Sequence, residues 1–107
     1  GKILMSEATD YTNEAQQRIC RVILLLAGNE FDGVAPSEMA QAAGTTPSNI
    51  TRALFNLQRA GFAERMQTGR WRLGPKLIQI ALAFSTHVGR KSEQLTELVQ
   101  RYTRLPG

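Results

Sequence analysis

A segment near the middle of the sequence, from Thr46 to Gly61, has the clearest helical signature of the chain. Thr46 is a good N-cap, and a proline at the first helical position loses only an N–H that would have no helical partner there. Four apolar residues recur at helical spacing and form a narrow stripe: Ile50, Ala53, Leu54 and Leu57. Since Gly61 ends the pattern, we expect a helix over residues 47–60 with one buried face.

The other face of this helix has side chains suited to reading nucleic acid. They are short hydrogen-bonding groups and one guanidinium: Ser48, Asn49, Thr51, Arg52 and Asn56. Such groups reach base edges and phosphates when a helix lies in a DNA major groove. An ordinary amphipathic helix with a solvated polar face shows the same pattern, so this helix alone does not decide between the two readings.

A first helix is predicted upstream, with Asn13 as its N-cap and Gly28 just after its end. Cys20 lies within its apolar run, and we expect it to be a buried small hydrophobe. As the only cysteine, it excludes an internal disulfide or a cysteine metal cluster.

A second, shorter helix is predicted over residues 36–43, because proline begins it and Gly44 follows it. Residues 34–35 are compatible with a short strand before it. A helix, a turn that contains glycine and a second helix with a polar outer face together indicate a helix-turn-helix.

After the central helix the apolar period changes from helical to a period of two, which predicts a β-hairpin that turns at residues 67–69. We expect Trp71 and Leu73 on the core side and Arg70 and Arg72 on the outer side. A hairpin with two outward arginines beside a polar helix is a wing that can follow a phosphate backbone or enter a minor groove. For Trp71, a core anchor is favoured over a platform for base stacking.

Two further helices are predicted after Pro75, with a break at residues 89–91 and Ser92 as the cap of the last helix, which runs to about Arg104. The last helix has a narrow apolar stripe close to a seven-residue repeat: Leu95, Leu98, Val99, Tyr102 and Leu105. This stripe packs either on the protein's own core or on a second copy. We favour dimerisation, because twofold homodimers are common.

The net charge of +4 over 107 residues is unevenly distributed. The segment from Arg52 to Lys76 has six basic residues and one acidic residue, whereas the chain through Thr51 is net acidic. A concentrated basic region is typical of a polyanion-binding surface. Lys76 opposes the dipole of its own predicted helix, which favours an anionic partner nearby. A solvated surface that only maintains solubility is the alternative.

Several function classes are disfavoured. His87 is the only histidine, and the sequence has no spaced carboxylate pair or phosphate-cradling glycine loop, so we expect neither an enzyme nor a metal centre nor a cofactor. No apolar run approaches a membrane span, and the N-terminus lacks a secretory signal. We expect no membrane association and a nucleoid-associated location in the cytoplasm, for a protein that is prokaryotic or encoded by a phage.

From about Ala15 to Leu82 the sequence resembles the N-terminal DNA-binding domain of the isocitrate lyase regulator (IclR) family. The matching segments are PSEMAQAAG, ITRALFNLQRAGFAER and TGRWRLGPKL. The last is the most specific, because six of its residues match the point where that family closes its wing and begins a linker helix: Gly69, Arg70, Arg72, Leu73, Gly74 and Pro75.

The resemblance implies a winged helix that inserts its third helix into the major groove and binds palindromic sites as a dimer. It places Ser48, Asn49, Thr51 and Arg52 toward DNA, with Arg70 and Arg72 in or near the wing. There are two departures from the family: Pro47 stands where a basic residue is frequent, and the large effector-sensing domain is absent. We therefore expect either the DNA-binding fragment of a larger regulator or a compact regulator.

Taken together, the sequence predicts a mainly α fold with a small β-hairpin, that is, a winged helix-turn-helix over residues 13–74. A mobile arm over residues 1–12 precedes it, and C-terminal helices over residues 75–105 follow. The function expected is sequence-specific binding of double-stranded DNA by a transcriptional repressor, with residues 47–60 in the major groove and residues 65–72 on the backbone or minor groove. Lys76 and Asn56 complete the predicted DNA contacts. The alternative is a winged-helix module that binds a protein partner through its last helix.

Overall fold

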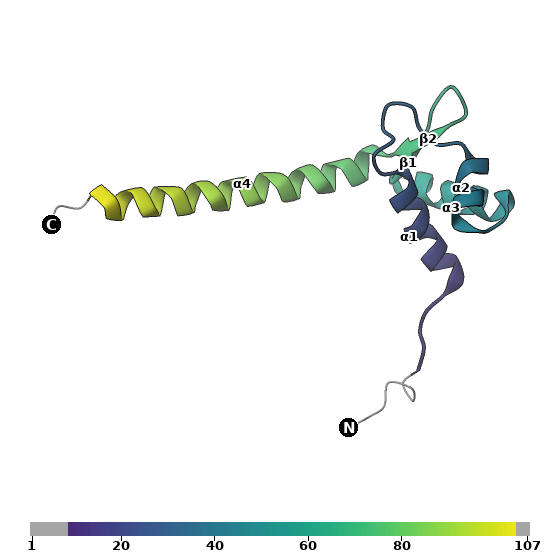
Figure 1. Cartoon of the computed structure of the whole chain (residues 1–107), viewed down its shortest axis with the longest axis horizontal. Coiled ribbons are helices and arrows are strands. Elements are labelled where there is room, and N and C mark those ends of the chain that lie inside the picture. Colours follow the sequence, from purple (N-terminus) through teal and green to yellow (C-terminus); the bar gives the residue numbers. More distant parts are fainter. Residues whose placement is uncertain (1–8, 105–107) are drawn as a thin grey trace.

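The computed structural model describes residues 9–104 and consists of a compact head and one long helix that projects from it (Figure 1). The elements in order are α1 (Glu14–Leu26), α2 (Pro36–Ala43), α3 (Pro47–Ala60), β1 (Ala63–Arg65), β2 (Trp71–Leu73) and α4 (Pro75–Arg104). We call residues 14–74 the head. The fold is mainly α with a small β-hairpin, as the sequence predicts.

The ends of the three head helices follow from local chemistry. The side chain of Asn13 accepts a hydrogen bond from the backbone of Gln16 at 3.0 Å, and Thr46 caps α3 in the same way. Gly44 and Gly61 end α2 and α3 with φ values of 65° and 83°. Glycine reaches this left-handed region without steric cost, so each helix stops where the chain must turn.

The wing is an antiparallel pair in which Ala63 lies opposite Leu73 and Arg65 lies opposite Trp71. A third segment joins it, because Val34 and Trp71 exchange two backbone hydrogen bonds of 2.7 and 2.9 Å. Of the short strand expected at residues 34–35, only Val34 forms a bridge, and Ala35 is not part of a strand. The bridge also ties the wing to the loop that leads into α2.

The core of the head is a single apolar cluster. Its buried members come from all three head helices and both strands: Val22, Leu26, Met39, Ala40, Ile50, Ala53, Leu54, Leu57, Ala63 and Trp71. The stripe predicted for α3 is buried throughout, and Trp71 is a core anchor as predicted. Burial of these side chains is the main force that holds the three helices and the wing together.

Gly74 connects the wing to α4 in a space too small for any other residue. A Cβ atom at this position would lie 2.5 Å from the carbonyl oxygen of Gly61 and 2.8 Å from the backbone nitrogen of Ala63. Two hydrogen bonds then start α4 beside the end of α3, from the N–H of Lys76 to Gly61 and from the N–H of Ile78 to Gly74. The direction of α4 is therefore set at this junction.

Three sequence predictions are wrong: the break at residues 89–91, the cap at Ser92 and the burial of Cys20. The chain does not break at residues 89–91, and Ser92 caps no helix, because α4 continues through both without interruption. A single glycine inside a helix costs only about 1 kcal/mol relative to alanine, which is too little to stop a helix with good formers on either side of Gly89. Cys20 is exposed rather than buried, since α1 turns Val22 and Leu26 toward the core and leaves Cys20 outside that face.

The predicted N-terminal arm falls largely outside the described residues, which begin at Thr9. Residues 9–13 have no regular secondary structure. Over residues 9–104, no helix combines the length and the apolar character needed to cross a bilayer.

Candidate nucleic-acid interface

The outer face of α3 is the side of that helix that points away from the core. Six exposed residues at helical steps form it: Ser48, Thr51, Arg52, Phe55, Asn56 and Arg59. Four of them were predicted from the sequence as DNA contacts, whereas Phe55 and Arg59 were not. The face is polar and cationic, with one aromatic ring in its middle.

Local hydrogen bonds orient several of these side chains. The hydroxyl of Thr51 donates to the carbonyl of Pro47 at 2.9 Å, and the amide of Asn56 donates to the carbonyl of Arg52 at 2.8 Å. Both side chains therefore lie along the helix and keep their oxygen atoms free to accept hydrogen bonds.

Asn49 differs from the other contacts predicted on α3 because it is half-buried and points toward the turn before this helix. Its amide donates to the hydroxyl of Thr45 at 3.0 Å. This bond uses one of its two amide hydrogens. Asn49 therefore lies at the edge of the outer face, beside the start of the helix.

The wing approaches α3 closely enough to leave a groove between them. This groove, of about 210 Å³, is lined by residues of α3, of the wing and of the start of α2: Pro36, Thr51, Leu54, Phe55, Arg65, Gly69 and Trp71. The helix face and the wing thus belong to one surface. Arg65 is exposed on the wing side of the groove, and the sequence reasoning did not single it out.

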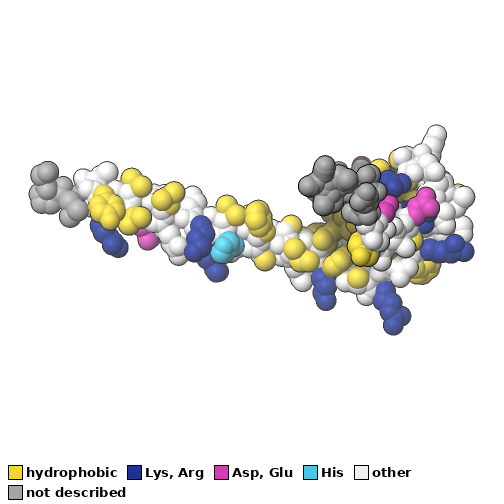
Figure 2. Space-filling model, turned by 90° about the horizontal axis from the view of Figure 1, so that it is seen from below, with side chains coloured by type: hydrophobic (Ala, Val, Ile, Leu, Met, Phe, Trp, Pro, Cys, Tyr) yellow, Lys and Arg dark blue, Asp and Glu magenta, His cyan; other side chains and the backbone are white. Residues whose placement is uncertain are grey.

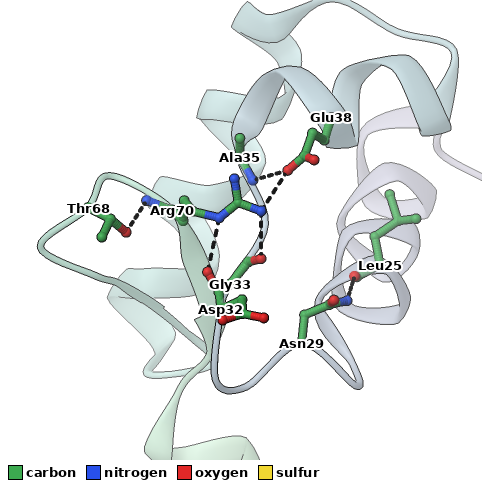
Figure 3. Close-up of polar contacts among 8 residues, drawn as sticks. All are labelled: Leu25, Asn29, Asp32, Gly33, Ala35, Glu38, Thr68 and Arg70. Atoms are coloured by element: carbon green, nitrogen blue, oxygen red, sulfur yellow. Dashed lines mark hydrogen bonds and ion pairs between the residues drawn. The ribbon is translucent and has the colours of Figure 1, made fainter.

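Arg70, a predicted DNA contact, holds the wing to α2 within the protein (Figure 3). Its Nε donates to the carbonyl of Asp32 at 2.9 Å, and its Nη2 donates to the carbonyl of Gly33 at 3.1 Å and to Oε1 of Glu38 at 3.0 Å. The guanidinium therefore joins the wing to the loop before α2 and to α2 itself, both more than thirty residues earlier in the sequence. With these partners in place, contact between Arg70 and DNA stays a prediction.

Glu38 is the common partner in this network. Its Oε1 also accepts a hydrogen bond from the backbone N–H of Ala35 at 2.9 Å, which satisfies a donor at the start of α2. The Ala35 N–H, and after it the positive charge of Arg70, lower the pKa of Glu38 below its ordinary value. Glu38 therefore stays ionised in mildly acidic solution and keeps both contacts.

Arg72 is also engaged within the head. Its Nε donates to Oε2 of Glu64, directly across the hairpin, at 2.6 Å. Arg72 and Glu64 are both half-buried. Lys76, the remaining predicted contact, is exposed on the first turn of α4 and packs beside Gly61, at the far end of α3 from Ser48.

The residues predicted for dimerisation lie on α4, far from the head, except Leu105, which lies outside the described residues. The other four have exposed side chains in this single chain: Leu95, Leu98, Val99 and Tyr102. Figure 2 shows apolar side chains along most of the length of α4. Over residues 75–103 of this helix, Leu77 is the only residue that is even half-buried.

Neither a protein-family model nor a curated protein sequence matches the chain. Solved structures do match it. An IclR-type transcriptional regulator from Alicyclobacillus acidocaldarius aligns over 65% of this chain and 28% of its own, with a TM-score of 0.60 and 28% sequence identity. This chain has an IclR-type winged-helix fold.

Two other solved structures have a similar fold. The repressor BlcR from Agobacterium tumefaciens aligns over 88% of this chain and 38% of its own, at a TM-score of 0.60 and 23% identity. A Zα domain of Cyprinid herpesvirus 3, solved in a binding mode to Z-DNA, aligns over 54% of this chain and 93% of its own, at a TM-score of 0.50 and 20% identity.

The IclR-type winged helix described here is shorter than the regulators that it matches. It spans 28% and 38% of the two bacterial proteins. The alignment with BlcR reaches into α4, because residues 1–74 make up less than three quarters of the chain. The likeness therefore includes the start of the projecting helix as well as the head.

Proposed function

We propose that this protein binds double-stranded DNA in a sequence-specific manner and regulates transcription, with α3 in the major groove and the wing along the backbone or in the minor groove. The observation that carries the proposal is the single exposed surface made by α3 and the wing. Arg52 and Arg59 lie on the helix side of it, and Arg65 lies on the wing side. Among the described residues, none of these three arginines takes part in an ion pair, so all three guanidinium groups can donate hydrogen bonds to phosphates.

Within this surface we assign two roles. Arg52 and Ser48 lie near the N-terminal half of α3, where a recognition helix contacts base edges. Arg59 and Arg65, with Lys76 beyond them, contact phosphates and give affinity without sequence preference. Thr51 and Asn56 supply oxygen acceptors on the same face of α3.

The test is selection of bound duplexes from a random pool, followed by titrations at two salt concentrations. Arg52→Ala is expected to reduce the preference for the selected duplex over a scrambled one. Arg65→Ala is expected to weaken binding to both duplexes alike and to lower the salt slope by about one. The proposal fails if the wild-type protein binds no duplex at low salt.

We further propose that the protein acts as a homodimer through α4. Apolar residues recur along this helix in alternating steps of four and three, with Lys91 as the single charged member of the series: Leu77, Ala81, Phe84, Val88, Leu95, Leu98 and Tyr102. Such a series is typical of a coiled-coil seam. A palindrome among the selected duplexes would support a twofold dimer, and its half-site spacing would report the dimer geometry.

Repression is the mode of regulation that we propose, because it needs only occupancy of a site that overlaps a promoter. A reporter gene behind the selected duplex should show lower expression when the protein is present. The second candidate function, a module that binds another protein, is favoured by the same exposed apolar face of α4. It would be preferred if the protein ignored duplex DNA yet formed a stable complex with a different chain.

A further inference from the structure

Phe55 is an apolar side chain in a place where the fold does not need one. The other large apolar residues of α3 are almost fully buried, whereas Phe55 is 60% exposed in the middle of the cationic outer face. Arg52 and Arg59 lie one helical turn from it on either side along this face, and Thr51 lies on the same face. An exposed aromatic ring among cationic and hydrogen-bonding side chains is positioned for contact with a bound partner.

The ring of Phe55 is held in position from below. It packs edge to face against Trp71, with ring centroids 6.4 Å apart and an interplanar angle of 70°. Trp71 is itself fixed, since it is only 5% exposed and makes two backbone hydrogen bonds to Val34. Phe55 therefore projects from a rigid support, and little conformational freedom is lost when a partner contacts it.

Hollows lie on both sides of the ring. One is the groove of about 210 Å³ that separates Phe55 from Arg65 and Gly69 of the wing. The other, of about 420 Å³, is lined by Phe55 itself with Asn56, Gln58 and Arg59. Phe55 thus lines both hollows and is accessible to a ligand that follows the outer face of α3.

We propose that Phe55 is a specificity-determining residue that contacts the C5-methyl groups of thymines in the major groove. This inference rests on the proposed function, because it requires α3 to lie in that groove. The ring has no hydrogen-bonding group, so it does not select a base by donor or acceptor pattern. The thymine methyl is the one apolar group that a base edge displays in the major groove, and Phe is among the side chains that contact it. The half-site should then contain thymine opposite the middle of α3.

The test uses the duplex selected by the wild-type protein and replaces its thymines one at a time with deoxyuridine, which lacks only the methyl group. At one or two positions the wild-type protein should lose about fourfold in affinity, the value that corresponds to one buried methyl group. Phe55→Ala should bind the selected duplex about tenfold more weakly and should no longer distinguish thymine from deoxyuridine there. Phe55→Leu should keep part of the discrimination.

Arg59→Ala is the matched control, because Arg59 lies on the same face and lines the same hollow as Phe55. It should weaken binding to every duplex and leave the ratio of thymine to deoxyuridine affinities unchanged. The proposal is overturned if the wild-type protein binds all deoxyuridine duplexes as tightly as the selected one. In that case the proposed DNA-binding function is unaffected. Failure of the wild-type protein to bind any duplex would overturn both that function and the thymine contact of Phe55. The deoxyuridine comparison does not depend on whether Phe55→Ala folds, since the wild-type protein carries it.

Discussion

The head and α4 are built on opposite principles. The head buries an apolar cluster contributed by α1, α2, α3 and both strands. By contrast, no side chain of α4 is fully buried over residues 75–103, and its apolar residues there are exposed except for Leu77. The head is therefore held by its own tertiary packing. A helix such as α4 depends on local propensity until a partner covers it, because most helical stability in proteins comes from packing of an apolar face.

The largest expected effect is a difference in the free energy of unfolding between two leucine-to-alanine substitutions, one in the head and one in α4. Leu54→Ala, in the core of the head, should lower the free energy of unfolding by about 2–5 kcal/mol, because it leaves a cavity. Leu98→Ala, on the exposed face of α4, should change the stability of the dilute protein by no more than about 0.5 kcal/mol. Urea unfolding monitored by Trp71 fluorescence measures both. Equal losses would mean that α4 is packed as firmly as the head.

The junction provides the next test. Gly74→Ala introduces a Cβ atom 2.5 Å from the carbonyl oxygen of Gly61, and we expect a loss of about 1–3 kcal/mol. Gly89→Ala is its control, since a Cβ atom there meets nothing within 4 Å and alanine is a better helix former. Gly89→Ala should raise the helical signal in circular dichroism and leave the head unchanged. A harmless Gly74→Ala would contradict the tight junction.

A smaller effect is expected for the network that joins the wing to α2. Arg70→Ala removes three hydrogen bonds made by a partly exposed guanidinium, and it should cost about 1–2 kcal/mol. Arg70→Lys, which keeps the charge but not the planar fork, should recover part of this loss. If Arg70→Ala left stability intact but weakened DNA binding at every sequence, Arg70 would be a phosphate contact instead.

The smallest effect concerns the pH dependence of Glu38. Its pKa is lowered in the folded protein, chiefly by the Ala35 N–H and then by Arg70. The stability that the ionised carboxylate contributes is therefore present above its ordinary pKa and is lost as the pH falls through the lower, folded value. The stability of the wild-type protein should decrease more steeply than that of Glu38→Gln between about pH 5 and about pH 3. Thermal melting at a series of pH values measures the difference, and parallel curves would contradict the assignment.

Much of the head follows from local rules, and so it could be predicted. Asn13 and Thr46 cap the helices that their side chains suggest, and Gly44 and Gly61 adopt the left-handed conformation at the two helix ends. Trp71 is buried because the period-two pattern of the hairpin places it on the core side. In each case the cause lies within a few residues of the effect.

Some features could not be predicted because they depend on contacts between residues distant in the sequence. Others depend on small differences in free energy between a continuous and a broken helix. Arg70 appears as an outward residue in the hairpin pattern, but its acceptors come from the loop around Asp32 and from α2. No local pattern predicts a contact across more than thirty residues. The break expected at Gly89 failed because one glycine costs less than the helix around it supplies.

The exposure of Phe55 is a feature that the sequence pattern of α3 does predict. Phe55 follows Leu54 directly, so a helix that buries Leu54 turns the next residue by about 100° toward solvent. Its exposure could therefore have been deduced from the buried stripe. The packing against Trp71 could not, because it depends on how the wing returns to α3.

The tight seat of Gly74 has a mechanical consequence. At 1.5 Å per residue, the 30 residues of α4 extend for about 45 Å. A small rotation of the helix axis at Gly74 therefore becomes a large displacement at the far end of α4. A rotation of about 10° at Gly74 would move the C-terminal end of α4 by about 8 Å. Conversely, a partner bound at the tip of α4 would set the orientation of the head relative to that partner. It would do so across a distance that no side chain of the head could span.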